Sequence, residues 1–321
     1  MKRTPDGFML AMLLVLGLAW LFPEPGARGG WLHPEILTKA GIALIFFLHG
    51  AALPLSALKA GTLRWPLHAV IQATTFIVFP VLGLLILALA GPLLSSELRL
   101  GVFYLCALPS TVSSSIAFTA AARGNVPSAV FNATLSGLLG VFLTPLWIGL
   151  LLTTAGHALP LGRVIGDLAL WLLLPLALGQ AARPFIGSFI TAHRARIGLV
   201  DRATILLLVY TSFADSFQQG VWSGHGFGLL ASLSVGAVVL FVGVAALVNR
   251  VCCALGFPTE DRIAAILCGS KKTLASGVPM ASLIFGAHPG LGVILLPIMI
   301  YHQLQLVLCA WLVDRWSRRP L

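Results

Sequence analysis

Long apolar runs follow one another along the whole chain, and short segments rich in proline, glycine and charged residues separate them. A helix that spans the hydrocarbon core of a bilayer needs about 20 mostly apolar residues, and the runs approach this length. The pattern therefore predicts an all-α polytopic membrane protein with ten transmembrane helices. The predicted spans cover residues 8–22, 36–56, 66–91, 100–121, 127–154, 164–187, 199–217, 227–249, 262–285 and 290–313.

The composition agrees with a chain that is covered by lipid. Of the 321 residues, 58% are hydrophobic and only 9% are charged, whereas soluble domains carry about 25% charged residues. The net charge of +10 would suggest nucleic acid as the partner of a soluble protein, but here the positive residues lie between apolar runs and indicate topology. The five cysteines show no metal-ligand spacing, so we expect them to be reduced and structural.

Lysine and arginine orient the predicted spans. The apolar run after Lys2 and Arg3 resembles a signal peptide, but no small-x-small cleavage site follows, so we expect a retained first helix. With the N-terminus in the cytoplasm, 14 of the 20 lysines and arginines fall in cytoplasmic segments and 4 on the opposite side, as the positive-inside rule requires. We expect a bacterial inner-membrane protein, monomeric or homodimeric, with both termini cytoplasmic and no nucleic-acid partner.

Ten spans divide into two halves of five, residues 1–156 and 157–321. An odd number of spans gives the second half the opposite orientation, which is the inverted-repeat plan of many transporters. The fourth and ninth spans hold corresponding positions, and each carries a polar interruption with a proline and several hydroxyls, at residues 109–116 and 270–279. One such cluster would more often reflect Ser and Thr that pack helices closely. Two clusters in matching spans favour a site built from broken helices that cross.

A broken helix leaves backbone groups unpaired, and each costs several kcal/mol in hydrocarbon. The breaks are therefore expected to face protein, water or a ligand, with half-helix ends that attract anions or cations. The candidate binding residues of the two interruptions are Ser110, Thr111, Ser113, Ser114, Ser115, Ser270, Lys271, Lys272, Thr273 and Ser276.

Asp215 is the one acidic residue that lies well inside a predicted span. An intramembrane carboxylate is costly and by default indicates function. It could carry a proton, pair with a lysine or arginine, or lie at the interface where the seventh span ends. His49 and His302 also lie in apolar runs, where a histidine is more often a packing residue than a proton relay. All three are candidates for a role in coupling.

Several segments resemble the bile acid:sodium symporter family, and the resemblance covers nearly the whole chain. Residues 46–50 (FFLHG) are similar to the signature of the second span, and residues 122–126 (ARGNV) to the turn after the first broken helix. Other segments resemble the branch typified by member 7 of solute carrier family 10: residues 108–114, 131–133, 144–146, 210–215, 277–280 and 297–302. The resemblance implies a panel domain of spans one, two, six and seven and a core domain of spans three to five and eight to ten. It also implies sodium-driven transport of organic anions, with movement of the core against the panel.

The sodium ligands of the family carry over only in part. The Ser-Asn pair at the first crossing falls on Ser115 and Ile116, and the Ser and Thr ligands of the fifth span fall on Ala129 and Ala133. The family's glutamate falls on or near Ser270. Asn132 and Ser128 in the fifth span are one residue away and could substitute only if the helix were rotated. The family's glutamine in the third span falls near Thr75, with Gln72 one turn before. Sodium could then be held by Ser114, Ser115, Asn132 and Ser270.

Lys271 and Lys272 stand beside the position of the missing carboxylate. We hypothesise that one of them supplies a built-in cation and bonds the hydroxyls of Ser113, Ser114 and Thr119. The alternative is that one lysine extends to the surface and the other pairs with an acid.

The sequence thus predicts a secondary active transporter of a small organic anion, such as a bile acid, a steroid conjugate or another carboxylate or sulfate. We expect no cofactor, and sodium or a proton as the coupling ion. One alternative is a regulatory membrane protein that transports nothing. Another is an intramembrane enzyme with Ser270 and a neighbouring lysine as nucleophile and base. The enzyme is disfavoured, because adjacent helical residues point about 100° apart.

Overall fold

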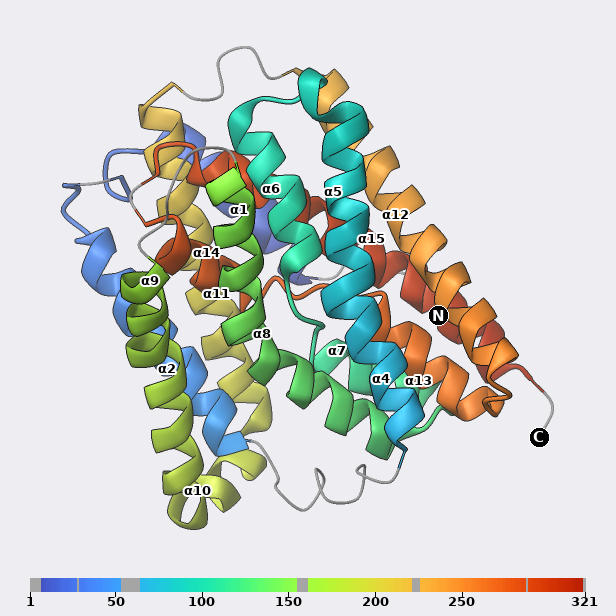
Figure 1. Ribbon diagram of the computed structural model, residues 1–321. Helices are drawn as coiled ribbons and strands as arrows, with labels where there is room; N and C mark the ends of the chain where they lie inside the picture. The colour runs from blue at the N-terminus through green and yellow to red at the C-terminus, as the bar shows by residue number, and fades with distance from the viewer. Residues whose placement is uncertain are drawn as a thin grey trace. The chain divides into compact units, whose positions relative to one another are not determined.

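The structure, a computed structural model, describes residues 7–27, 29–52, 64–154, 161–220, 226–286 and 288–319. All regular secondary structure in this part of the chain is helical (Figure 1). Two apolar helices, α1 (Gly7–Leu21) and α2 (Pro34–Ala52), occupy the first two predicted spans; residues 53–56 of the second lie outside the described part. Six further helices are long and apolar enough to cross a membrane: Trp65–Leu93, Val126–Leu152, Gly166–Ala192, Arg196–Gln218, Gly228–Ala254 and Leu291–Ser317. The chain is a polytopic membrane protein.

Each of the two polar interruptions separates a pair of short helices. Residues 108–112 lie between α6 (Ser96–Ala107) and α7 (Ser113–Ala121), and residues 270–276 lie between α13 (Thr259–Gly269) and α14 (Gly277–Ile284). Both breaks are shorter than the sequence predicts. Ser113 already begins α7, and Pro279 lies in the first turn of α14, where a proline sacrifices no hydrogen bond.

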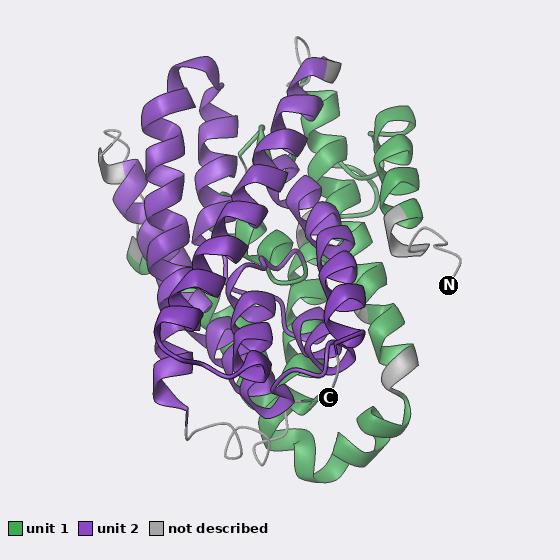
Figure 2. Ribbon diagram, turned by 90° about the vertical axis from the view of Figure 1, so that its right-hand side faces the viewer, with its two compact units in different colours: residues 1–53, 158–224, 275–295 green, residues 54–157, 225–274, 296–321 purple. Residues whose placement is uncertain are grey.

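The chain forms two compact units, which Figure 2 colours separately. Unit 1 consists of Met1–Leu53, Ala158–Gly224 and Ala275–Leu295. Besides α1, α2 and α14, its helices are α9 (Leu161–Leu168), the π-helix η3 (Ala169–Leu173), α10 (Leu174–Ala192) and α11 (Arg194–Gln218).

Two glycines let α2 and α10 approach closely within unit 1. A Cβ atom on Gly50 would collide with the carbonyl oxygen of Leu176, and one on Gly179 would collide with that of Phe47. Small residues at such contacts are the usual means of packing helices in lipid, where the hydrophobic effect gives no attraction between them.

Unit 2 consists of Pro54–His157, His225–Leu274 and Leu296–Leu321. Besides α6, α7 and α13, its elements are α4 (Trp65–Ala73), the π-helix η1 (Thr74–Val78), α5 (Phe79–Ala90), the 3-10 turn η2 (Gly91–Leu93), α8 (Val126–Thr154), α12 (Phe227–Ala254) and most of α15 (Leu291–Ser317). A Cβ atom on Gly140 of α8 would lie 2.6 Å from Cγ of Pro109. The first interruption therefore fits against α8 because residue 140 has no side chain.

A polar cluster fixes the beginning of α13. The Asp261 carboxylate, only 2% exposed, accepts a hydrogen bond from Asn125 (2.7 Å) and pairs with Arg64 (3.2 Å). The N–H of Asn125 also donates to the carbonyl oxygen of Glu260 at 3.0 Å. Acidic residues in the first turn of a helix stabilise its positive end. This cluster joins the turn after α7 to the start of α13.

Candidate functional site

The two interruptions contact each other in unit 2, as the sequence predicts. The N–H of Thr273 donates to the carbonyl oxygen of Pro109 at 3.1 Å. The Ser110 hydroxyl donates to the carbonyl oxygen of Cys268, near the end of α13. Carbonyl groups at the end of a helix lack a partner within the helix, and here the other broken span supplies one.

The hydroxyls around the start of α7 form a directed chain of hydrogen bonds. Ser115 donates to the carbonyl oxygen of Leu267 at 3.0 Å, so its oxygen is free to accept from Thr111 at 2.9 Å. Thr111 in turn accepts from Ser114 at 3.1 Å. Because the Ser114 hydrogen is used in this way, its oxygen can only accept from the next group, which is Lys271.

The side chain of Lys271 is completely buried. Its Nζ lies 2.7 Å from Oγ of Ser114 and 4.6 Å from the centroid of the Phe118 ring. A hydroxyl oxygen and the face of an aromatic ring both attract a cation. No carboxylate bonds this ammonium within the described part of the chain.

The side chain of Lys272 is also completely buried, and its surroundings differ. Its Nζ donates to three backbone carbonyl oxygens, those of Leu108 at 2.6 Å, Cys106 at 2.8 Å and Thr75 at 2.9 Å. The centroid of the Phe79 ring lies 4.1 Å from the same nitrogen. The three carbonyl groups use all three hydrogens of the ammonium.

Two of these carbonyl groups are available because α6 ends beside them. The last carbonyl groups of a helix have no N–H four residues ahead within the helix. The N–H of Ser110, which could have bonded Cys106, donates instead to Oγ of Ser136 at 2.9 Å. Leu108 lies in the extended backbone directly after α6.

The third carbonyl group is available because of a π-turn next to a proline. The N–H of Phe79 bonds the carbonyl oxygen of Thr74, five residues before it, and so does not bond that of Thr75. The next residue, Pro80, has no N–H. The carbonyl oxygen of Thr75 is thus left without a backbone donor inside a helix, and Lys272 takes the vacant position.

Helix α15 holds the second interruption through two side chains that the sequence analysis did not single out. The Gln305 amide accepts from the N–H of Lys272 at 2.8 Å and donates to its carbonyl oxygen at 2.7 Å. The Tyr301 hydroxyl donates to the carbonyl oxygen of Ser270 at 2.7 Å. His302, a predicted coupling residue, is half-buried, and its Nδ1 lies 2.9 Å from Nε2 of Gln305. Two glutamines in an apolar span, Gln303 and Gln305, are the signal that could have identified this role.

Asn132 and Gln72 form a second buried cluster. Nε2 of Gln72 lies 3.2 Å from Oδ1 of Asn132, whose own amide donates to the carbonyl oxygen of Ser128 at 2.9 Å. Nδ1 of His68 lies 2.8 Å from the Asn132 amide nitrogen. The Thr75 hydroxyl bonds back to the carbonyl oxygen of Ile71 at 2.9 Å, so only the backbone of Thr75 contacts a lysine.

The residues considered for sodium are engaged by other groups in this structure. Ser270 donates back to the carbonyl oxygen of Ile266 at 2.6 Å, Asn132 belongs to the cluster with Gln72, and the Ser114 oxygen already faces an ammonium. Two positive charges on one oxygen repel each other. Within the described ranges there is also no group of three His, Cys, Asp or Glu side chains that could hold a metal.

The expectation that a lysine bonds Ser113 and Thr119 is wrong. Of the three hydroxyls, Lys271 reaches only Ser114. Successive residues of α7 point about 100° apart, and Ser113 is exposed. The Thr119 hydroxyl is buried without a hydrogen-bond partner in the described structure. The alternative, in which one lysine extends to the surface and the other pairs with an acid, is wrong for both lysines, since neither is exposed and neither pairs with an acid among the described residues.

Three predicted residues lie in unit 1. Asp215 is buried in α11 and accepts a hydrogen bond from Gln219 at 3.0 Å, one turn from the end of the helix. His49 is exposed on α2, and Ser276 is half-buried directly before α14. The structure thus brings most of the candidates in the two interruptions together in unit 2, and Asp215 has its own polar surroundings in unit 1.

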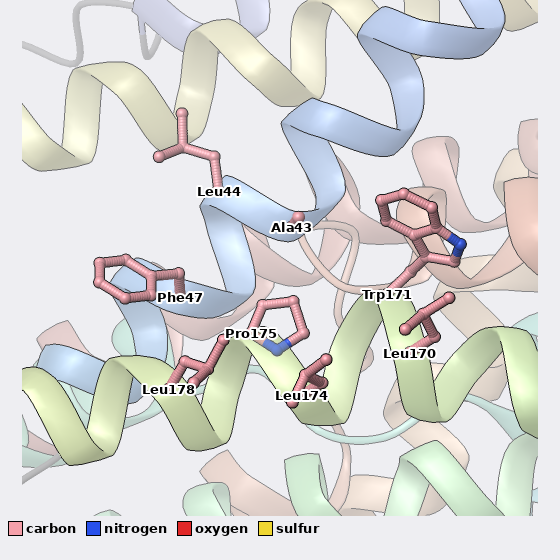
Figure 3. Close-up of a pocket in the computed structure, with 8 residues that line it drawn as sticks. All are labelled: Ala43, Leu44, Phe47, Leu170, Trp171, Leu174, Pro175 and Leu178. Carbon is pink, nitrogen blue, oxygen red and sulfur yellow. The ribbon is translucent and has the colours of Figure 1, made fainter.

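Unit 1 also has a shallow apolar groove of about 440 Å³ between α2 and the segment formed by η3 and α10 (Figure 3). Its walls consist of Ala43, Leu44, Phe47, Leu170, Trp171, Leu174, Pro175 and Leu178. None of these is a predicted site residue, and none carries a charge or a hydroxyl that could select an anion.

Comparisons with known proteins identify the family of the chain. Residues 6–318 match the model of the SBF-like CPA transporter family. The chain is 44% identical over 318 residues to "Uncharacterized protein PA2026" of Pseudomonas aeruginosa, covering 99% of this chain and 95% of that protein. It is 42% identical to "Putative symporter YfeH" of Escherichia coli (strain K12), covering 99% and 94%. It is 31% identical to "Sodium/bile acid cotransporter 7" of Rattus norvegicus, covering 96% and 91%. The resemblance found in the sequence is thereby confirmed, and the chain belongs to the SBF-like CPA transporter family.

Proposed function

We propose that the protein is a secondary active transporter that moves a small organic anion by alternating access. The observation that carries this proposal is the Lys271 ammonium, which is buried where the two broken helices meet and has no carboxylate partner in the described part of the chain. Ser114, in the first turn of α7, accepts a hydrogen bond from it at 2.7 Å. An ammonium beside the positive end of a helix favours an anion.

The architecture we propose has ten spans in two inverted repeats, residues 1–156 and 157–321, with a panel and a core domain. The composition of the two units supports it. Unit 1 includes the predicted spans one, two, six and seven, which would form the panel. Unit 2 includes spans three to five, the eighth, the first part of the ninth and most of the tenth. The second half of the ninth span, α14, groups with unit 1 and is the exception.

The proposed substrate is a carboxylate or sulfate on an apolar body, such as a bile acid or steroid conjugate. The rat relative is named a sodium/bile acid cotransporter, which supports this class. We propose that sodium is not required, since the residues considered for it are occupied by other bonds. Asp215 is then the candidate proton carrier, because it is a buried carboxylate within a span.

A two-step experiment tests this function. Purified protein is first screened by thermal shift against organic carboxylates and sulfates, because a ligand that binds only the folded state raises the melting temperature. The anions that bind are then supplied to proteoliposomes with an imposed pH gradient. We expect accumulation that Lys271→Gln abolishes. Binding without accumulation would support a regulatory protein instead, and chemical conversion of the anion would support an enzyme.

A further inference from the structure

Lys272 differs from Lys271 in what surrounds its charge. Lys271 contacts one hydroxyl and one ring, whereas Lys272 contacts three backbone carbonyl oxygens and one ring. Carbonyl oxygens that converge on one point can replace the hydration shell of a monovalent cation, as they do in potassium channels. The environment of Lys272 is therefore that of a bound cation.

The number of acceptors indicates which form of the side chain is present. All three oxygens lie within 2.9 Å of Nζ. An ammonium has three hydrogens and no lone pair, so it satisfies three acceptors. A neutral amine has two hydrogens and would turn its lone pair toward the third oxygen. The geometry therefore fits the charged form.

The positive charge is balanced by dipoles rather than by an acid. Cys106 and Leu108 lie at the C-terminal end of α6, where the helix dipole places about half a negative charge. The face of the Phe79 ring, 4.1 Å from Nζ, adds a further attraction. None of the ion pairs in the described part of the chain includes this lysine.

We propose that the carbonyl oxygens of Thr75, Cys106 and Leu108 form a monovalent-cation site, which the Lys272 ammonium fills as a permanent occupant of the chain itself. The site is built by a helix end, a π-turn and Pro80, so it does not depend on the lysine for its existence. Shortening the side chain leaves the oxygens in place and opens room for a free cation. The inference concerns cation binding alone and does not require that the proposed transport is correct.

The test measures melting temperature and uses no transport. Lys272→Ala is purified and melted in chloride salts of ammonium, potassium, sodium and N-methyl-D-glucamine at equal ionic strength. We expect its melting temperature to be lowest in N-methyl-D-glucamine, which is too large for the site. Ammonium, the group most like the native occupant, should raise it saturably by about 3 °C at ten times the dissociation constant.

Three proteins serve as controls. The wild type and Lys39→Ala, which loses an exposed lysine that lies over Trp171 in unit 1, should melt at the same temperature in all four salts. Lys272→Met has a side chain of similar length without charge. It should melt below the wild type and show no response to ammonium, because its methyl group fills the site.

The inference is overturned if Lys272→Ala melts equally in all four salts, or if Lys272→Met is as stable as the wild type. Failure to purify folded Lys272→Ala in any of the salts also contradicts the inference, since a free cation should fill the vacated site. If the wild type takes up no anion while Lys272→Ala shows a saturable response to ammonium, the proposed transport is refuted and the cation site is still supported.

Discussion

The ammonium nitrogen of Lys272 lies 2.6 Å from the carbonyl oxygen of Leu108, the residue directly after α6. The lysine belongs to the second interruption and the carbonyl group to the first, so this bond joins the two broken spans directly. In the proposed cation site, this bond holds a positive charge that belongs to the chain itself.

Lys271→Gln should reduce the affinity for the transported anion about 10- to 100-fold, because a hydrogen bond to a charged group is worth about 1.5–3 kcal/mol. The measurement is the anion concentration that half-saturates the thermal shift. Lys39→Gln, which removes an exposed lysine, is the matched control and should bind the anion as the wild type does. Unchanged affinity in Lys271→Gln would show that Lys271 does not contact the substrate.

Gln305→Ala should destabilise unit 2, because it leaves the N–H and the carbonyl group of Lys272 without their partner. Each unpaired buried group costs about 1–3 kcal/mol, so for two groups we expect a loss of about 2–6 kcal/mol in the free energy of unfolding. Thermal melting measures it, with Gln303→Ala, a half-buried amide on the same helix, as the control. Equal melting temperatures for the two variants would contradict the role assigned to Gln305.

Gly140→Ala and Gly137→Ala should shift the melting temperature in opposite directions. A Cβ atom at residue 140 would meet the ring of Pro109 at 2.6 Å, whereas one at residue 137 meets nothing within 4 Å. Overpacking costs about 1–3 kcal/mol, and alanine in an unobstructed helix position gains about 0.5–1 kcal/mol over glycine. A shift of the same sign in both variants would show that Pro109 does not pack against α8 in this way.

Asp215→Asn should abolish the dependence of uptake on an imposed pH gradient if this carboxylate carries the proton. The amide keeps the size of the side chain and can still bond Gln219, so protein yield should not fall. Asp314→Asn, at an exposed acid that pairs with Arg318 at 3.0 Å, should leave the pH dependence as it is. A normal pH response in Asp215→Asn would remove Asp215 from the coupling mechanism.

Much of the fold could be predicted from the sequence. Apolar length predicts the spans, and the prolines and hydroxyls near Pro109 and Ser276 predict where two of them break. The sequence also predicts a bond from a lysine to Ser114, which Lys271 makes. The surroundings of Lys272 could not be predicted, because they depend on which carbonyl groups lack a donor. That in turn depends on the π-turn before Pro80 and on the hydrogen bond from Ser110 to Ser136. Gln305 was missed because its side chain bonds the backbone of Lys272, which lies 33 residues earlier in the sequence.

The most direct test of the central claim is uptake of a bound anion into proteoliposomes in which N-methyl-D-glucamine replaces sodium on both sides. Because Lys272 fills the cation site and Lys271 donates a hydrogen bond to the Ser114 oxygen, we predict the same initial rate of uptake in sodium and in N-methyl-D-glucamine. The account also predicts loss of uptake in Lys271→Gln under both conditions. Uptake that requires sodium and follows its gradient would contradict the account.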